Sequence, residues 1–139
     1  MKSMNKSKLK KIVKKIFLKH GLNNNHSEIS SNYIIKAELV GAPTHGLARL
    51  KMYCDRIKKK LINSNPKIKI KKISQSISLV DANNAIGFVG ADIGIKKAIS
   101  NAKKTGIGIV AIKNSGHYGL SSFYAEQAVK KNLTILCFT

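Results

Sequence analysis

Residues 106–131, GIGIVAIKNSGHYGLSSFYAEQAVKK, contain three consecutive patterns that decide the fold. The apolar, β-rich run Ile107–Ile112 predicts a strand covered on both faces, as in parallel sheets. A glycine-bracketed loop follows, and Ser121, Tyr124 and the alanines after them share one face of a predicted helix. The apolar run Leu133–Phe138 predicts a further strand, so the segment is expected to form a strand–helix–strand unit.

His117 lies in this loop, where the first predicted strand passes into its helix. In open α/β sheets, ligands bind at that carboxyl edge. Gly116 and Gly119 allow backbone angles that other residues resist, and they leave space beside the imidazole for a ligand. The loop is therefore a candidate binding site.

The first part of the chain predicts helices. Apolar residues within 9–17 recur with the spacing of an amphipathic helix, which Gly21 is expected to end. A second helix is expected from about Ser27 to Val40, with Asn25 and Glu28 placed as a capping box.

A break at Gly41–Thr44 precedes a third predicted helix, which opens near His45. His45 and Arg49 would then lie on one side of that helix, about a turn apart. Such a pair suits a 2-oxo or 2-hydroxy acid, because the guanidinium can hold a carboxylate while the imidazole exchanges a proton with the adjacent oxygen. The same spacing also fits a surface cation beside a histidine that caps the helix.

The pattern changes after Pro66. Two short strands are expected, the second over Ser76–Val80, followed by a turn at Asp81–Gly87 and a helix over Phe88–Lys104 that Gly106 closes.

We therefore expect a helical segment, residues 1–65, and an α/β segment, residues 66–139, with a mixed sheet. Gly87, Gly90 and Gly94 do not have the spacing of a dinucleotide fingerprint, so the predicted fold is not of the Rossmann type. The sequence also contains no P-loop and no zinc signature, and no metal site is expected.

The formal net charge of +20 would by itself suggest nucleic acid or an anionic surface as a partner. The lysines are dispersed over polar helix faces, however, and only Arg49 and Arg56 are arginines, the residue that base and phosphate recognition favours. The preferred interpretation is that the lysines lie on solvated helix faces, and that neither nucleic acid nor a membrane is a partner of the protein. The alternative is a small basic protein that binds nucleic acid or an anionic surface without catalysis.

Cys54 and Cys137 match no metal or redox spacing, which predicts reduced core thiols in a cytoplasmic protein. No stretch approaches the ~18 apolar residues of a membrane span. The amino-terminal residues carry lysines within their apolar stretch, unlike a secretory signal.

Three collinear motifs carry a resemblance to a known family. They are Thr44–Leu50 (THGLARL), then Leu79–Asp81 with Gly87, then Gly106–Gly108 leading to Asn114–Gly119 (NSGHYG). Together they resemble the type 2 malate/L-lactate dehydrogenase family, which includes ureidoglycolate dehydrogenase, sulfolactate dehydrogenase and diketogulonate reductase.

The resemblance implies an oxidoreductase that uses NAD or NADP, has a fold distinct from Rossmann and works as a homodimer. Hydride would pass between nicotinamide and C2 of a 2-hydroxy or 2-oxo acid such as malate or lactate. His45 and His117 match the family's two active-site histidines, and its members differ in which one is the acid/base. Arg49 matches the residue that holds the substrate carboxylate.

Other positions follow from the same motifs. Thr44 is expected to contact the substrate, and Gly116 and Gly119 are expected to contact the cofactor. Two of these positions depart from the family pattern: Thr44 stands where serine is usual, and Gly116 stands where asparagine is frequent. Family chains continue well beyond Thr139, and that part supplies much of the cofactor site. The chain is therefore expected to be an amino-terminal portion, truncated and inactive alone.

Overall fold

The computed structural model describes residues 5–139. The chain divides into two compact units, the first ending at Asn65 and the second running from Pro66 to Thr139. The first unit is helical, and the second combines a sheet with two helices. No helix within residues 5–139 has both the length and the apolar character needed to cross a membrane.

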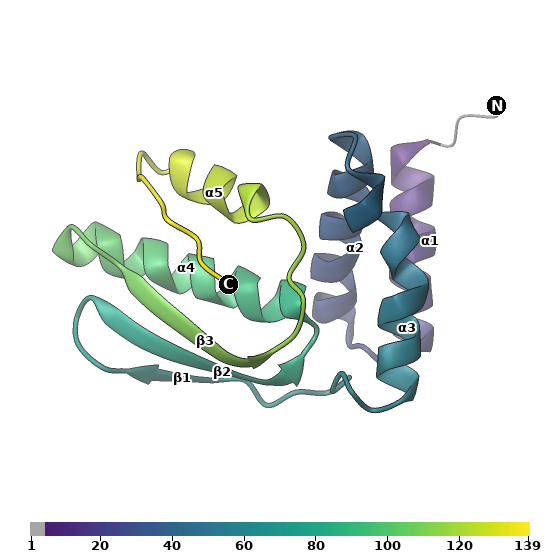
Figure 1. Ribbon diagram of the computed structural model, residues 1–139, viewed down its shortest axis with the longest axis horizontal. Helices are drawn as coiled ribbons and strands as arrows, with labels where there is room; N and C mark the ends of the chain where they lie inside the picture. Colours follow the sequence, from purple (N-terminus) through teal and green to yellow (C-terminus); the bar gives the residue numbers. More distant parts are fainter. Residues whose placement is uncertain (1–4) are drawn as a thin grey trace. The chain divides into compact units, whose positions relative to one another are not determined.

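Three α-helices form most of the first unit: α1 (Lys6–Lys19), α2 (Asn24–Leu39) and α3 (Leu50–Lys58) (Figure 1). Gly21 follows α1 with a positive φ of 93°, which confirms the predicted helix end. Its N–H donates to the carbonyl of Leu18, as in a Schellman cap. The buried apolar side chains of this unit come from all three helices and include Val13, Phe17, Ile34, Tyr53 and Ile57.

The start of α2 differs from the prediction. Asn23, and not Asn25, is the N-cap, and its side chain accepts a hydrogen bond of 2.8 Å from a backbone N–H of the first turn. Glu28 does not complete a capping box, because its carboxylate forms ion pairs with Lys10 and Lys14 of α1. Tertiary packing of α1 against α2 therefore decides the position of Glu28.

The ion pairs of Glu28 predict a specific pH dependence of stability. The hydrogen bond from Lys10, followed by that from Lys14, lowers the pKa of Glu28 from 4.5 to about 2. Since the folded-state pKa lies below the unfolded one, the carboxylate stabilises the fold above about pH 4.5, and this contribution is lost as the pH falls towards 2. Glu28→Gln should therefore be less stable than wild type at pH 7 and nearly equal to it at about pH 2.

Urea denaturation of both proteins across this pH range measures the difference in free energy of unfolding. The difference at pH 7 should be modest, because the paired side chains are partly exposed to solvent. A difference that does not change with pH would contradict the ion pairs.

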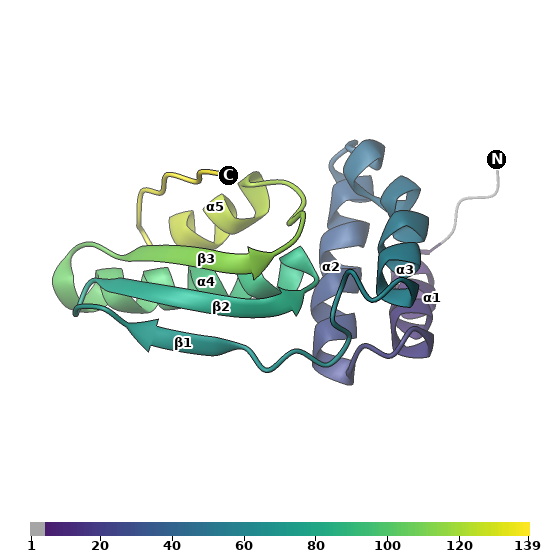
Figure 2. The same ribbon diagram turned by 60° about the horizontal axis from the view of Figure 1, so that its bottom comes forward.

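The second unit contains a mixed sheet. Its strands β1 (Lys69–Lys72), β2 (Ile77–Ala85) and β3 (Ile109–Ser115) lie in that order. β1 pairs antiparallel with β2, and β2 pairs parallel with β3, which confirms the predicted mixed α/β class. Helix α4 (Gly87–Thr105) connects β2 to β3 and packs on the sheet, and α5 (Ser122–Val129) contacts α4 (Figure 2).

The predicted turn over Asp81–Gly87 is wrong, because β2 continues through Asp81 to Ala85. Asn83 and Asn84 have φ values of 50° and 58°, and the register with β3 shifts there. Asparagine tolerates this left-handed region better than most residues. The two asparagines thus bend the strand without ending it.

The predicted strand over Leu133–Phe138 is also wrong, because the segment forms neither helix nor strand. Its Leu136 and Phe138 are 79% and 86% exposed. Within residues 5–139, β3 pairs only with β2, and its Ile109 and Ile112 are more exposed than a strand covered on both faces would allow.

The cysteines differ from each other. Cys54 is buried, as the prediction of a core thiol requires, whereas Cys137 is exposed. The prediction of a core position for Cys137 is wrong, because the segment around it forms neither helix nor strand and leaves it exposed.

Glycines allow α4 to approach β3 and the loop after it. A Cβ on Gly87 would collide with the carbonyl oxygens of Gly116 and His117. Gly90 and Gly94 similarly face side chains of β3. The three glycines therefore serve helix–strand packing, which agrees with the conclusion that they are not a dinucleotide fingerprint.

Candidate functional site

The first group of predicted site residues lies between α2 and α3. The chain forms two 3₁₀ turns there, η1 (Pro43–His45) and η2 (Leu47–Arg49), and α3 begins only after η2. The predicted placement of His45 and Arg49 on one α-helix is therefore wrong. Gly46 separates the two turns, with φ of −100° and ψ of −130°, which lie outside the helical region.

Thr44 nevertheless brings these two residues together. Its hydroxyl lies 3.2 Å from Nδ1 of His45, and its backbone carbonyl accepts a hydrogen bond of 2.8 Å from Nε of Arg49. His45 is half-buried and Arg49 is exposed. The hydroxyl and the backbone carbonyl of Thr44 thus assemble the three residues.

The guanidinium of Arg49 is oriented by this contact. Its Nε–H is engaged by Thr44, and Nη1 makes a 3.8 Å contact with the sulfur of Met52. Because the Nε–H is already used, a carboxylate would have to be held through the two Nη nitrogens.

His117 lies just beyond β3, at the carboxyl edge that the parallel strands β2 and β3 share. The residue is exposed, and nothing lies within 4 Å of the position that a Cβ on Gly116 would take. A ligand can therefore approach the backbone at Gly116. Gly119 differs, because its φ is 84° and a Cβ there would lie 2.8 Å from the ring of Phe88.

Asp81 holds the start of this loop. Its Oδ1 accepts hydrogen bonds from Nδ2 of Asn114 at 2.9 Å and from the N–H of Asn83 at 3.0 Å, and its Oδ2 lies 3.3 Å from Nζ of Lys113. The bond from Asn114 is the largest of the causes that lower the pKa of Asp81. This contact was not predicted from the sequence, although Asp81 and Asn114 follow predicted strands whose parallel pairing places the two residues at one edge of the sheet.

The other end of the loop is fastened to α5. The hydroxyl of Tyr124 donates to the carbonyl of Tyr118 at 2.6 Å, and the two rings lie 5.4 Å apart between centroids. The hydroxyl of Tyr118 lies 2.8 Å from Oγ of Ser121. The loop that carries His117 is thus held at both ends.

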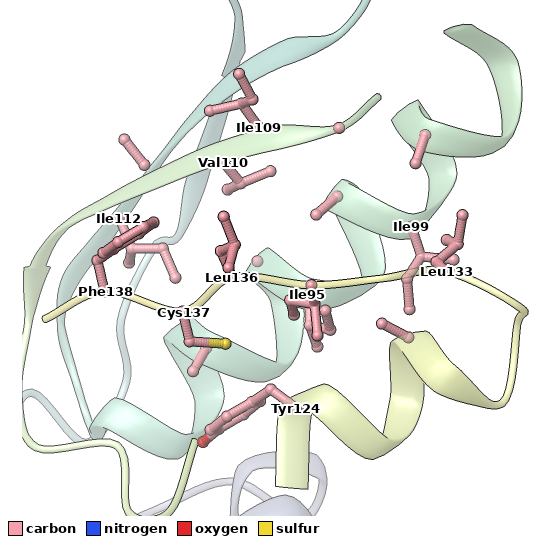
Figure 3. Close-up of a pocket in the computed structure, with 18 of the residues that line it drawn as sticks. Ile95, Ile99, Ile109, Val110, Ile112, Tyr124, Leu133, Leu136, Cys137 and Phe138 are labelled. Atoms are coloured by element: carbon pink, nitrogen blue, oxygen red, sulfur yellow. The ribbon is translucent and has the colours of Figure 1, made fainter. Parts of the chain in front are cut away.

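An apolar groove of about 1140 Å³ adjoins the loop (Figure 3). It is bounded by α4, β3, α5 and residues 132–139, and Gly116 and Tyr118 also line it. Figure 3 labels Ile95, Ile99, Ile109, Val110, Ile112, Tyr124, Leu133, Leu136, Cys137 and Phe138 among the lining residues. Among the described residues, no charged side chain lines the groove.

The candidate residues thus form two groups. Thr44, His45 and Arg49 belong to the first unit, whereas Gly116, His117 and Gly119 belong to the second. Within residues 5–139, no three His, Cys, Asp or Glu side chains are placed to hold a metal ion.

Comparison with known proteins matches residues 4–139 to a family model described as malate/L-lactate dehydrogenase. The malate/(S)-sulfolactate dehydrogenase of Methanothermus fervidus is 34% identical over 92% of this chain, and the match covers 38% of that relative. The malate dehydrogenase of Pyrococcus abyssi is 37% identical over 96% of this chain and 37% of the relative. The chain thus spans little more than a third of the length of these curated relatives.

Solved structures give the same result. The malate dehydrogenase of Pyrococcus horikoshii matches 92% of this chain with a TM-score of 0.89 and 34% identity, over 37% of its own length. The malate dehydrogenase of Entamoeba histolytica matches 94% of this chain with a TM-score of 0.89 and 35% identity, over 36% of its length. The resemblance carried by the three sequence motifs is confirmed.

Proposed function

Because the chain belongs to the malate/L-lactate dehydrogenase family, we propose that it supplies the substrate-binding and proton-transferring residues of an NAD(P)-dependent oxidoreductase. The substrate is a 2-hydroxy or 2-oxo acid such as malate or lactate, and the reaction passes a hydride to or from its C2 carbon. Relatives that use NAD(+) and NADP(+) both occur, namely a ureidoglycolate dehydrogenase and a sulfolactate dehydrogenase, so the proposal includes either cofactor.

The observation that carries this proposal is the assembly of Thr44, His45 and Arg49 by the 3.2 Å and 2.8 Å contacts of Thr44. In the proposed mechanism, the Nη nitrogens of Arg49 bind the substrate carboxylate. The oxygen on C2 is then the next polar atom of the substrate. A histidine beside that oxygen can remove or supply its proton.

His45 and His117 are the two candidates for this proton transfer. The contact between Nδ1 of His45 and the Thr44 hydroxyl fixes the orientation of that imidazole. In oxidation, the acid/base histidine takes the proton of the C2 hydroxyl; in reduction, it returns a proton to the C2 oxygen. We propose that the other histidine binds and orients the substrate.

The residues at the loop fit one part of a nicotinamide cofactor. Gly116 leaves its backbone open to a bound group, and we propose that Gly116 and Gly119 contribute the part of the cofactor site that this chain contains. The cofactor, when bound, supplies or accepts the hydride. We further propose that the complete enzyme is a homodimer in the cytoplasm.

A small basic protein that binds nucleic acid or an anionic surface is not favoured. The family model covers residues 4–139, and the curated relatives that match nearly the whole chain are dehydrogenases.

A first experiment compares the isolated chain with a chimera. In the chimera, residues 1–139 replace the matching part of the Pyrococcus horikoshii malate dehydrogenase. We expect no measurable reduction of 2-oxo acids by the isolated chain with NADH or NADPH, because hydride transfer requires the nicotinamide to be held in reactive geometry. Robust turnover by the isolated chain would refute this expectation, whereas turnover by the chimera alone would support it.

A further inference from the structure

The end of α2 folds the chain back over its own last turn. Gly41 has a φ of 73°, and its N–H donates to the carbonyl of Glu38 at 3.2 Å. The N–H of Ala42 donates to the carbonyl of Ala37 at 2.9 Å. These two bonds form a Schellman motif. The motif is followed by η1 and η2, whose residues include the proposed substrate-binding group.

The side chain of Glu38 reaches η2 across this turn. Its Oε1 accepts a hydrogen bond of 2.5 Å from the N–H of Leu47, the first residue of η2. N–H groups in the first turn of a helix have no partner within that helix, and a carboxylate is a strong acceptor for them. Glu38 therefore ties η2 to the last turn of α2.

Gly46 leaves room for the contact between Glu38 and Leu47. The residue is buried, and a Cβ built on it would collide with the carboxylate of Glu38. The absence of a side chain at position 46 therefore lets the carboxylate reach the N–H of Leu47.

We propose that Glu38 is a positioning residue for Thr44, His45 and Arg49. Its bond to Leu47 fixes the backbone step at Gly46, which is where η1 ends and η2 begins. The N–H of Arg49 then donates to the carbonyl of Gly46 at 3.0 Å, and its Nε donates to Thr44. Without the carboxylate, the backbone at Gly46 is no longer held in place. The imidazole of His45 and the guanidinium of Arg49 then lose their fixed positions relative to each other.

Three substitutions distinguish the contribution of the length of the Glu38 side chain from that of its charge. Glu38→Gln keeps the length and an acceptor oxygen, Glu38→Asp keeps the charge on a shorter side chain, and Glu38→Ala removes both. We expect Gln to behave nearly as wild type, whereas Asp should behave as Ala. Asp55→Ala is the matched control, because it removes one carboxylate from the same unit at a site paired with Lys51.

Hydrogen exchange of the Leu47 amide, followed by NMR on residues 1–139, measures the contact directly. In Glu38→Ala and Glu38→Asp it should be faster by about tenfold or more, since the Leu47 N–H loses the acceptor that protects it from exchange. The Arg49 Nε–H resonance should shift in the same variants, and the amide of Ile34 in the core should keep its exchange rate. The control should leave all three signals unchanged.

Gly46→Ala provides an independent test. In the wild-type background it should speed exchange at Leu47 as Glu38→Ala does, and in the Glu38→Ala background it should add much less, because the two substitutions break one contact. Unchanged exchange at Leu47 in Glu38→Ala, or fully additive effects of the two substitutions, would overturn the proposal. An unshifted Arg49 Nε–H resonance would overturn the positioning role as well.

The expected effect of Glu38 on substrate binding rests on the proposed function. Titration with oxalate, a mimic of a 2-oxo acid, tests that part separately. If wild type binds oxalate and Arg49→Ala does not, Glu38→Ala should weaken binding by about tenfold and Glu38→Gln should restore it. If wild type and Arg49→Ala respond alike, the proposed function of Arg49 fails, while amide exchange and the Arg49 resonance still decide the role of Glu38.

Discussion

Replacing the acid/base histidine by asparagine is expected to lower kcat by about 10²–10⁴-fold, the range that general acid–base catalysis contributes. The variants His45→Asn and His117→Asn are to be assayed in the chimera, with saturating cofactor and varied 2-oxo acid. One variant should lose kcat in this range, because asparagine cannot carry the proton at neutral pH. The other should mainly raise KM.

His20→Asn is the matched control for this pair. His20 follows α1 and its ring nitrogen Nδ1 lies 2.9 Å from the carbonyl of Ile16, so we give it no part in the reaction. Its substitution should leave kcat unchanged. If His45→Asn and His117→Asn both keep kcat/KM within a few-fold of wild type, the assignment of the histidines is wrong.

Arg49→Lys is expected to lower kcat/KM for a 2-oxo acid by about 10- to 100-fold. Lysine keeps the charge but has no planar fork for the carboxylate, so the exchange is not conservative. The expected loss corresponds to roughly 1.5–3 kcal/mol for charged hydrogen bonds. In this chain the fork must be formed by the two Nη nitrogens, because Nε donates to Thr44.

A substrate with a neutral amide in place of the carboxylate separates the roles of Arg49. Such a substrate already lacks most of the interaction, so Arg49→Lys should barely change its kcat/KM. Arg56→Lys, at the chain's other arginine, should affect neither substrate. An equal loss for acid and amide would mean that Arg49 supports the fold or the cofactor instead.

The backbone around His45 and Arg49 differs from the one that the sequence predicts. The spacing of His45 and Arg49 suggested one helix face, but Gly46 interrupts the helix and the contacts of Thr44 assemble the pair. Helix periodicity contains no information about a backbone carbonyl that accepts from an arginine. Thr44 therefore contacts both residues, although the helix face that their spacing predicted does not form.

Long-range contacts explain the other differences. Glu28 pairs with α1 instead of capping α2, and Glu38 reaches Leu47, nine residues away. Asp81 meets Asn114 only because β2 and β3 pair in parallel. By contrast, α4 and its end at Gly106 depend on local apolar spacing and a left-handed glycine, and both were predicted correctly.

Transfer of deuterium from C2 tests the central claim most directly. The chimera is given NAD(+) or NADP(+) and 2-hydroxy acids deuterated at C2, such as malate and lactate, and the reduced cofactor is analysed by mass spectrometry. We predict one deuterium per molecule of reduced cofactor with at least one of these acids, and loss of that transfer when Arg49 is replaced by alanine. A chimera that is folded by circular dichroism but transfers no deuterium from any of these acids would contradict the proposed function.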